Sequence, residues 1–470
     1  MMKKLYILFS ILIITTTCLS QSCLPEGIEF TTQEQIDNFQ ANYPDCSKIL
    51  GTVNIGAINN DTSDINNLIG LNSIEVIGGA LRIDDTDNLQ NLDGLESLDS
   101  ISNSLIIGSD WIRGTSPNES LSNIDGLSGL SYVGSSVSIK YNPLLENLDG
   151  LSGLSFDGSS VYSVYIEYNP LLENLDGLIS ITSIEGGLYI RDNSNLTDLN
   201  GLNNLSSIGG RLYISSNSNL TDLNGLNNLT TIGERLFIRF NHNLTDLNGL
   251  NNLISIDNNL WISGNDNLTN LNGLNNLSSI GGGVYGGHLY IWQNSNLTDL
   301  NGLNNLTTIG GTLSIIENDN LTALNGFNNL LSIEGYLSIY DNNSLSECEI
   351  QSICAYLENP NGSVYISDNA VGCNSVAEVE NACNPVGINE NTLFSNVSIY
   401  PNPSNGLINI DLGSLKDVSI KVLSVRGQLI YYKKNIDTPI YQFELDAAPG
   451  IYILELSAEG EKQQFKLVKN

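Results

Sequence analysis

The chain has 470 residues and a formal charge of −33 at pH 7, from 18 basic and 51 acidic side chains. It is too long for one ordinary compact core, so we expect several domains or a repeat array. A surface this negative repels phosphate backbones and anionic membranes, which argues against nucleic acid as a partner. It suits a well-solvated exterior or a cationic partner.

The first 20 residues, "MMKKLYILFSILIITTTCLS", combine two lysines, an apolar run from Leu5 to Ile14 and a small polar exit. This pattern is typical of a secretory signal peptide, and no later apolar run approaches membrane length. We therefore expect a secreted protein with no membrane-spanning segment in the mature chain. Loss of the two lysines leaves the exported chain at −35.

The segment 21–52 is predicted to form an N-terminal cap. Within it, "TTQEQIDNF" (31–39) has the pattern of a capping-box helix that turns Ile36 and Phe39 inward. Six cysteines follow the signal peptide, and an even number in an exported chain indicates disulfides. We expect Cys23 to pair with Cys46. Cys348 and Cys354 are expected to pair with Cys373 and Cys383, in an order that stays open.

Residues 53–346 contain a repeat of 24 residues, marked by glycines that follow asparagine or aspartate at Gly177, Gly201, Gly225, Gly249 and Gly273. Insertions around Trp111, around residues 156–161 and at residues 282–287 interrupt the period. Strand centres spaced in this way predict about thirteen coils, ending with one near residue 364. A single coil has no core of its own, so the coils must stack.

One unit, "GRLYISSNSNLTDLNGLNNLTTI" (210–232), shows how a coil is built. Leu212 and Ile214 alternate with outward residues, which predicts a short strand with one buried face. Asn217 follows in a turn, where its amide can bond backbone groups that would otherwise be buried and unpaired. Leucines then recur at intervals of three between poor helix formers, which indicates tight corners, and "NLTTI" can supply a second strand. The predicted fold is an all-β, parallel β-helix or leucine-rich-repeat-like solenoid.

Residues 347–383 are predicted to hold the last coil and a disulfide-bonded C-terminal cap, with "ECEIQSICAYLEN" (347–359) as a helix. The repeating unit "LYIxxNxxLxxLxGLxxLxxIGG" resembles the receptor L domain and the leucine-rich-repeat-like β-helix of bacterial surface proteins. The opening "LPEGIEFTTQEQIDNFQANYPDCSKILGTVNI" resembles the entry segment of that group. The resemblance spans residues 23–383 and implies a binding solenoid whose ligand is not defined.

A linker is expected at residues 384–396, and residues 397–470 read as about seven hairpin-linked strands of a small, Ig-like β-sandwich. The pieces "YPNPSNG", "RGQLI", "APGIYIL" and "KLVKN" resemble the type A C-terminal sorting domain of the Bacteroidetes type IX secretion system. This resemblance implies that the tail engages the secretion machinery, reaches the outer face of the outer membrane and is removed. The matching residues are Tyr400, Pro401, Asn402, Pro403, Gly406, Gly427, Pro449, Gly450, Tyr452 and Lys466.

The sequence contains no recognisable catalytic constellation. Its two histidines, His242 and His288, have no nucleophile at a known spacing, and no nucleotide or zinc-protease fingerprint is present. The many Asp and Asn residues lack the full EF-hand spacing, although an adventitious calcium site stays open. We expect no enzyme, no resident metal and no cofactor.

One outward-facing column of the strands is unexpectedly aromatic over six consecutive coils, at Tyr165, Tyr189, Tyr213, Phe237, Trp261 and Tyr290. The column two residues further on adds Arg191, Arg239, Trp292 and Tyr340. These residues can form a stacked ladder that only stabilises the sheet, or a recognition stripe for a protein or carbohydrate at the cell surface. We expect a non-catalytic binding or adhesion protein, with a structural coat component and an accessory glycan-binding protein as alternatives.

Overall fold

The computed structural model describes residues 21–57, 63–108, 116–155, 163–281, 286–384, 392–394 and 396–470. The chain forms two compact units, Met1–Cys383 and Asn384–Asn470. The expected signal peptide, the insertion around Trp111 and most of the expected linker lie outside the described residues. No helix in the described part of the chain is long and apolar enough to cross a membrane.

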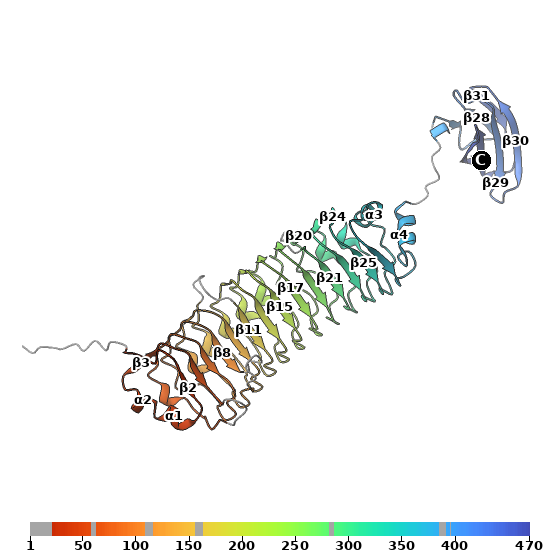
Figure 1. The fold of residues 1–470 in the computed structure, drawn as a ribbon. Helices are drawn as coiled ribbons and strands as arrows, with labels where there is room; N and C mark the ends of the chain where they lie inside the picture. Colours follow the sequence, from red (N-terminus) through yellow and green to blue (C-terminus); the bar gives the residue numbers. More distant parts are fainter. Residues whose placement is uncertain are drawn as a thin grey trace, which may run out of the picture. The chain divides into compact units, whose positions relative to one another are not determined.

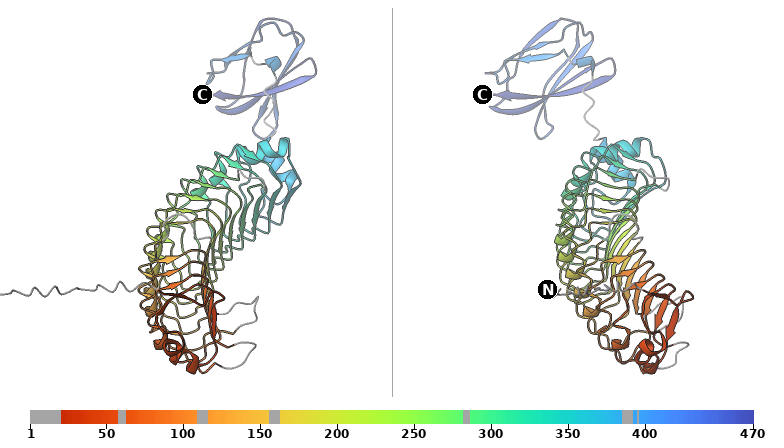
Figure 2. Two further views of the ribbon diagram at one scale, coloured as in Figure 1. Left: turned by 60° about the vertical axis from the view of Figure 1, so that its left-hand side comes forward. Right: turned by 90° about the vertical axis from the view of Figure 1, so that its left-hand side faces the viewer.

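The first unit is a stack of coils, each of which adds one strand to a long parallel sheet (Figure 1). Figure 2 shows that the stack bends gently along its length. The predicted strand centres all lie in this sheet, and the fourteenth strand, β2, comes from the segment assigned to the N-terminal cap. In spatial order the strands are β2 (Ile28–Phe30), β4 (Val53–Ile55), β6 (Leu81–Ile83), β8 (Leu105–Gly108), β10 (Val137–Lys140), β11 (Val164–Glu167), β13 (Leu188–Arg191), β15 (Leu212–Ser215), β17 (Leu236–Arg239), β19 (Leu260–Ser263), β21 (Leu289–Trp292), β23 (Leu313–Ile316), β25 (Leu337–Tyr340) and β26 (Val364–Ser367).

Most coils also contribute a shorter strand to one of two further parallel sheets, as the "NLTTI" pattern predicts. The first of these sheets contains β1 (Gln21–Cys23), β3 (Cys46–Ile49), β5 (Val76–Ile77), β7 (Ser100–Ile101) and β9 (Tyr132–Val133). The second contains β12 (Ser183–Ile184), β14 (Ser207–Ile208), β16 (Thr231–Ile232), β18 (Ser255–Ile256), β20 (Ser279–Ile280), β22 (Thr308–Ile309) and β24 (Ser332–Ile333).

The leucines spaced at threes form tight corners, many of which are single 3-10 turns such as Asn224–Leu226. All the inward residues of the coil at 210–232 are at most 1% exposed, namely Leu212, Ile214, Leu220, Leu223, Leu226, Leu229 and Ile232. The coils together form one continuous hydrophobic core from Phe30 to Val379. Because each coil buries these side chains against its neighbours, stacking and not the single coil makes the core.

A ladder of buried asparagines connects the coils along the turn that follows each long strand. Asn217 has no exposed surface, and its Nδ2 donates to the backbone oxygen of Ile190 in the preceding coil at 2.9 Å. Its Oδ1 accepts the backbone N–H of Asn193 at 3.1 Å, and its own N–H donates to Asn241 Oδ1 at 3.1 Å. The amide therefore satisfies backbone groups of the neighbouring coil, which sequence reasoning placed only within the turn.

The glycines that mark the period lie where two coils approach most closely. A Cβ on Gly225 would lie 1.6 Å from the backbone oxygen of Leu199, and one on Gly201 would lie 1.7 Å from that of Leu175. A methyl group cannot fit against a backbone carbonyl at that distance. The period is therefore visible in the sequence because every coil needs a glycine at this contact.

The N-terminal end of the stack is closed by α1 (Gln33–Asp37) and α2 (Phe39–Asn42), with Ile36 and Phe39 buried as predicted. The side chain of Gln35 accepts the backbone N–H of Thr32 at 3.1 Å, as a capping box requires. Cys23 and Cys46 form the expected disulfide, which joins β1 to β3.

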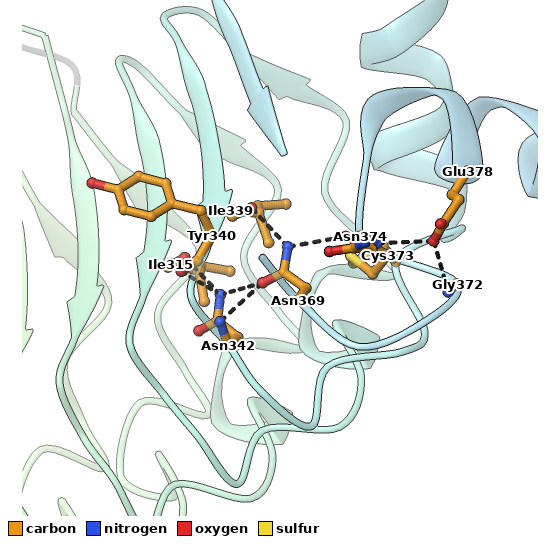
Figure 3. Close-up of a disulfide and its surroundings, with 10 residues drawn as sticks. Ile315, Ile339, Tyr340, Asn342, Asn369, Gly372, Cys373, Asn374 and Glu378 are labelled. Carbon is orange, nitrogen blue, oxygen red and sulfur yellow. Dashed lines mark hydrogen bonds between the residues drawn. A yellow bond between two sulfur atoms is a disulfide. The ribbon is translucent and has the colours of Figure 1, made fainter. Parts of the chain in front are cut away.

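The C-terminal end is closed by α3 (Gln351–Glu358) and α4 (Val376–Cys383). The order that the sequence left open is settled, because Cys348 pairs with Cys373 and Cys354 pairs with Cys383. Asn369 donates to the backbone oxygens of Ile339 at 2.9 Å and Cys373 at 3.0 Å (Figure 3). The last rung of the asparagine ladder thus bonds directly to a disulfide-bonded turn.

The second unit is a sandwich of seven strands, as predicted. One antiparallel sheet has the order β27 (Ser398–Tyr400), β28 (Leu407–Asp411) and β31 (Ile440–Glu444). The other has the order β30 (Leu429–Ile436), β29 (Val418–Ser424), β32 (Gly450–Ala458) and β33 (Glu461–Lys469). A separate core that includes Ile408, Ile420 and Leu454 lies between the two sheets.

Candidate binding surface

The aromatic column lies on the outward face of the long sheet, and its residues are direct register partners on adjacent strands. The partners run from Tyr165 through Tyr189, Tyr213, Phe237 and Trp261 to Tyr290. Parallel in-register strands hold identical positions about 4.8 Å apart, so every ring contacts the next. We call this set of six residues the aromatic row.

The geometry of the aromatic row changes along its length. Tyr165 and Tyr189 stack with centroids 4.7 Å apart and planes only 11° apart. From Tyr213 onward the rings tilt, and Trp261 and Tyr290 are 4.8 Å apart with planes at 40°. The early rings are therefore nearly parallel, whereas the rings at the far end are equally close but tilted against each other.

Arginines in the next column lie over rings of the aromatic row. The guanidinium of Arg191 is 5.3 Å from the centroid of Tyr213, and that of Arg239 is 4.7 Å from the centroid of Trp261. Arg239 Nε also donates to Ser263 Oγ at 3.1 Å. Cation–π contacts of this kind contribute about 0.5–2 kcal/mol each and hold both partners in place.

Trp292 joins the aromatic row from the arginine column. Its ring meets both Trp261, at 4.8 Å and 72°, and Tyr290, at 5.2 Å and 71°, edge to face. Its Nε1 donates to Ser314 Oγ at 2.9 Å, which fixes the orientation of the ring. Trp261, Tyr290 and Trp292 thus form a compact three-ring cluster at the end of the row.

Burial perturbs the titrating groups of this face. Burial raises the pKa of both Tyr189 and Tyr290. For Tyr290, the positive charge of Arg235 opposes this rise but is the smaller effect. Burial also lowers the pKa of His288, and the cation of Arg235 lowers it further. His288 Nδ1 accepts the backbone N–H of Thr312 at 2.9 Å, so the neutral ring carries its proton on Nε2.

The structure brings most of the predicted residues together, but not as a uniformly exposed stripe. Tyr165, Tyr189, Tyr213, Trp261, Tyr290 and Trp292 are half-buried. Phe237 is only 9% exposed, because Tyr213 and Trp261 pack on both sides of it, so it supports the row and offers little contact surface. Tyr340 pairs with Ile316 on β23 and lies two strands from Trp292, apart from the cluster.

Two residues near the cluster were not predicted as site residues. Arg235 and His288 each precede a strand, at the position where alternation again points outward. Reading that third outward column would have found them. Residues 282–285 of the insertion that precedes β21 are outside the described residues.

Metal binding finds no support in the turns. A shallow groove beside the sheet is lined by acidic residues that include Asp266, Glu317 and Asp319. Asp266 bonds His242 Nδ1 at 2.7 Å, and Asp319 accepts from Asn343 at a distance of 2.6 Å. Within the described ranges, no group of three or more His, Cys, Asp or Glu side chains is placed to hold a metal ion.

The residues of the predicted sorting motif hold the last strand of the second unit. Asn402 Nδ2 donates to the backbone oxygen of Lys466 at 2.7 Å, and Asn402 Oδ1 accepts the N–H of Val468 at 2.8 Å. Tyr452 donates its hydroxyl to the backbone oxygen of Ala448 at 2.6 Å. The motif at the start of the tail is thus bonded to the motif at its end.

Glycines and prolines of the sorting motif shape its turns. Gly406 and Gly427 have φ values of 118° and 78°, in the region that favours glycine. Pro449 directly precedes β32, which begins at Gly450. Pro401 and Pro403 lie between β27, which ends at Tyr400, and β28.

A capped parallel solenoid with an asparagine ladder and a separate seven-stranded sandwich define a repeat protein with a C-terminal accessory domain. The solenoid matches the Receptor L domain family over residues 45–145, 163–247 and 284–384, together more than half of the chain. The chain therefore belongs to the Receptor L domain family. Residues 398–470 match the secretion system C-terminal sorting domain.

The sorting domain is of the type IX kind and directs the protein to the cell surface or the extracellular space, through interaction with the secretion machinery. Among curated proteins, none matches the chain.

Proposed function

We propose that this secreted protein is a non-catalytic binding module that contacts a protein or carbohydrate through the outward face of its long sheet. The observation that carries the proposal is the aromatic row and its end cluster of Trp261, Tyr290 and Trp292. Large, half-buried aromatic side chains held in place before a ligand arrives lose little conformational entropy on binding. Such residues dominate the energetics of recognition surfaces.

A structural role has a specific observation in its favour. Tyr165 and Tyr189 stack on each other, and cross-strand aromatic pairs stabilise a sheet by about 0.5–1.5 kcal/mol each. A rod-like coat component would need nothing more from these rings. The two roles differ at the end cluster, where Trp292 departs from the stacked arrangement and meets Trp261 and Tyr290 edge to face.

The test is a binding screen of the exported chain, residues 21–470, against extracellular proteins and glycans. Wild type is compared with the triple variant Trp261→Ala/Tyr290→Ala/Trp292→Ala. The matched control is Tyr141→Ala/Tyr168→Ala, which removes a stacked ring pair, 4.4 Å apart, from the turn beside the same sheet.

We expect the triple variant to lose at least tenfold in affinity and the control to bind like wild type, with circular dichroism confirming that both fold. Equal binding by the triple variant would exclude the cluster as the contact. A wild type that binds nothing in the screen would favour the structural role.

A further inference from the structure

The basic residues of the solenoid are concentrated on one face. Residues 53–384 contain six described cations, and all lie at outward positions of the long sheet, at Arg82, Lys140, Arg191, Arg211, Arg235 and Arg239. The outward positions of each strand are its second and fourth residues and the residue before it. From β10 to β25 these positions hold five of the cations and a single carboxylate, Glu167. A body whose charge is strongly negative thus presents one positively charged face.

Some of these cations are already neutralised. Lys140 lies 2.8 Å from Glu167 Oε2, and Arg211 Nε lies 2.8 Å from Glu234 Oε2. Arg235 and Arg239, on either side of Phe237 on β17, have no carboxylate partner among the described residues. Arg235 Nε is buried and has no hydrogen-bond acceptor there. The positive charge available to a ligand is therefore greatest at β17.

The aromatic row ends on the strand beyond Trp261, whose ring is covered by Arg239. The register partner of Tyr290 on β23 is Ser314, and that of Trp292 is Ile316, so the aromatic row stops at this strand. Among the described residues, Tyr290 contacts the rings of Trp261, His288 and Trp292, but no ring of β23. The row therefore ends in a step, with the ring of Tyr290 on one strand and the small polar side chain of Ser314 on the next. Arg235 precedes β17, two strands from Tyr290, and its positive charge opposes the rise in the pKa of Tyr290 and lowers the pKa of His288.

We propose that the step at Tyr290 and Trp292, together with Arg235 and Arg239 two strands away at β17, binds an acidic carbohydrate that carries carboxylate groups. The inference rests on the proposed function and names its ligand class. A sugar ring stacks its apolar face on an aromatic side chain, and a guanidinium binds a carboxylate through two parallel hydrogen bonds. The acidic surface of the rest of the described solenoid repels the same polymer, which favours binding at this face.

An acidic peptide fits this face less well. Peptides that bind sheets usually add a strand at an edge and use free backbone groups. β21 is an interior strand, and its backbone is paired with β19 on one side and β23 on the other. The face therefore offers ring surfaces and guanidinium groups, which match a sugar acid, and no strand edge.

The experiment measures binding of the exported chain, residues 21–470, to three probes by calorimetry at low salt. The probes are an oligogalacturonate of about ten sugars, the neutral galactan of the same length and a poly-glutamate of matched charge. The test variant is Arg235→Gln/Arg239→Gln. The control variant Arg211→Gln/Glu234→Gln removes an ion pair one strand away without changing net charge.

We expect the oligogalacturonate to bind at least tenfold more tightly than either other probe, and the affinity to fall as salt rises. The Arg235/Arg239 variant should lose about tenfold or more, and the control less than twofold. Binding of galactan or poly-glutamate as tight as that of the oligogalacturonate would overturn the ligand class. So would unchanged binding by the Arg235/Arg239 variant.

Failure of this inference is distinguishable from failure of the proposed function. If the oligogalacturonate does not bind but another ligand does, and the ring variant Trp261→Ala/Tyr290→Ala/Trp292→Ala loses that ligand, the acidic carbohydrate is wrong and the binding face stands. If the oligogalacturonate binds equally to wild type and to the ring variant, both are wrong.

Discussion

The asparagine ladder gives the sharpest test of what holds the coils together, and Asn217→Ala is the change that isolates one rung. In the folded protein this substitution removes the acceptor of the Asn193 backbone N–H, 3.1 Å away, and the donor to the Ile190 backbone oxygen, 2.9 Å away. Both groups belong to the preceding coil, and both stay buried.

The size of the effect follows from the number of groups left unpaired. Ile190 pairs in register with Ile214 in the long sheet, so its oxygen keeps a ladder hydrogen bond, whereas the Asn193 N–H loses its acceptor. One buried backbone donor without a partner predicts a loss of about 1–3 kcal/mol in the free energy of unfolding. Asn219→Ala is the matched control, because Asn219 lies in the same turn and is exposed. A surface change of that kind stays within about 0.5 kcal/mol.

The assay is urea denaturation followed by tryptophan fluorescence. All three tryptophans precede residue 384, so the signal reports the first unit alone. With a slope of about 1–3 kcal/mol per molar urea, the midpoint of Asn217→Ala should fall by about 1 M. If Asn217→Ala and Asn219→Ala unfold at the same midpoint, the ladder does not stabilise the stack and the reasoning fails.

Two further predictions concern the coil contact and the neutral histidine. Gly225→Ala should destabilise the stack by about 1–3 kcal/mol or more, because its Cβ would overlap the Leu199 backbone oxygen. Gly153→Ala is the control and should be tolerated, because its Cβ would lie 3.4 Å from the nearest atom. Equal melting temperatures for the two variants would contradict this prediction. Because burial and Arg235 lower the pKa of His288, the unfolded chain binds the proton more readily, so this contribution to stability is present above pH 6.5 and is lost as the pH falls below it. The difference in melting temperature between pH 8 and pH 5.5 should therefore be smaller for His288→Gln than for wild type, and an unchanged difference would show that this ring does not contribute.

The fold was predictable because the same sequence pattern recurs in each coil, so every coil supports the same structural interpretation. The alternation of Leu212 and Ile214 and the leucines at threes predicted a strand followed by corners, and the structure confirms both. Asn217 was recognised as a buried turn residue for the right physical reason. Its partner in the preceding coil was not foreseen, because a periodic pattern shows which groups need a bond and not which coil supplies it.

Other features depend on side-chain packing that the period does not encode. The order of the rear disulfides depends on how α3 and α4 face each other, and both orders fit the same spacings. Phe237 and Tyr290 occupy equivalent positions, yet one is buried between rings and the other ends the row beside Ser314. Arg235 was overlooked because only the two outward columns within the strands were considered, and Arg235 lies in the outward column just before them.

The division between inward and outward positions explains how one stack can serve both stability and recognition. The inward residues, the asparagine ladder and the period glycines are the same in nearly every coil, so they carry the fold. The outward residues vary from coil to coil, and a change at Trp292 alters two edge-to-face contacts and one hydrogen bond without touching the core beneath. Because outward residues contact neighbouring coils only through side chains on the sheet surface, the surface at β17 to β23 can differ from the stacked pair at β11 and β13. That freedom is what a binding face requires, and it gives no advantage to a rod that only has to be stiff.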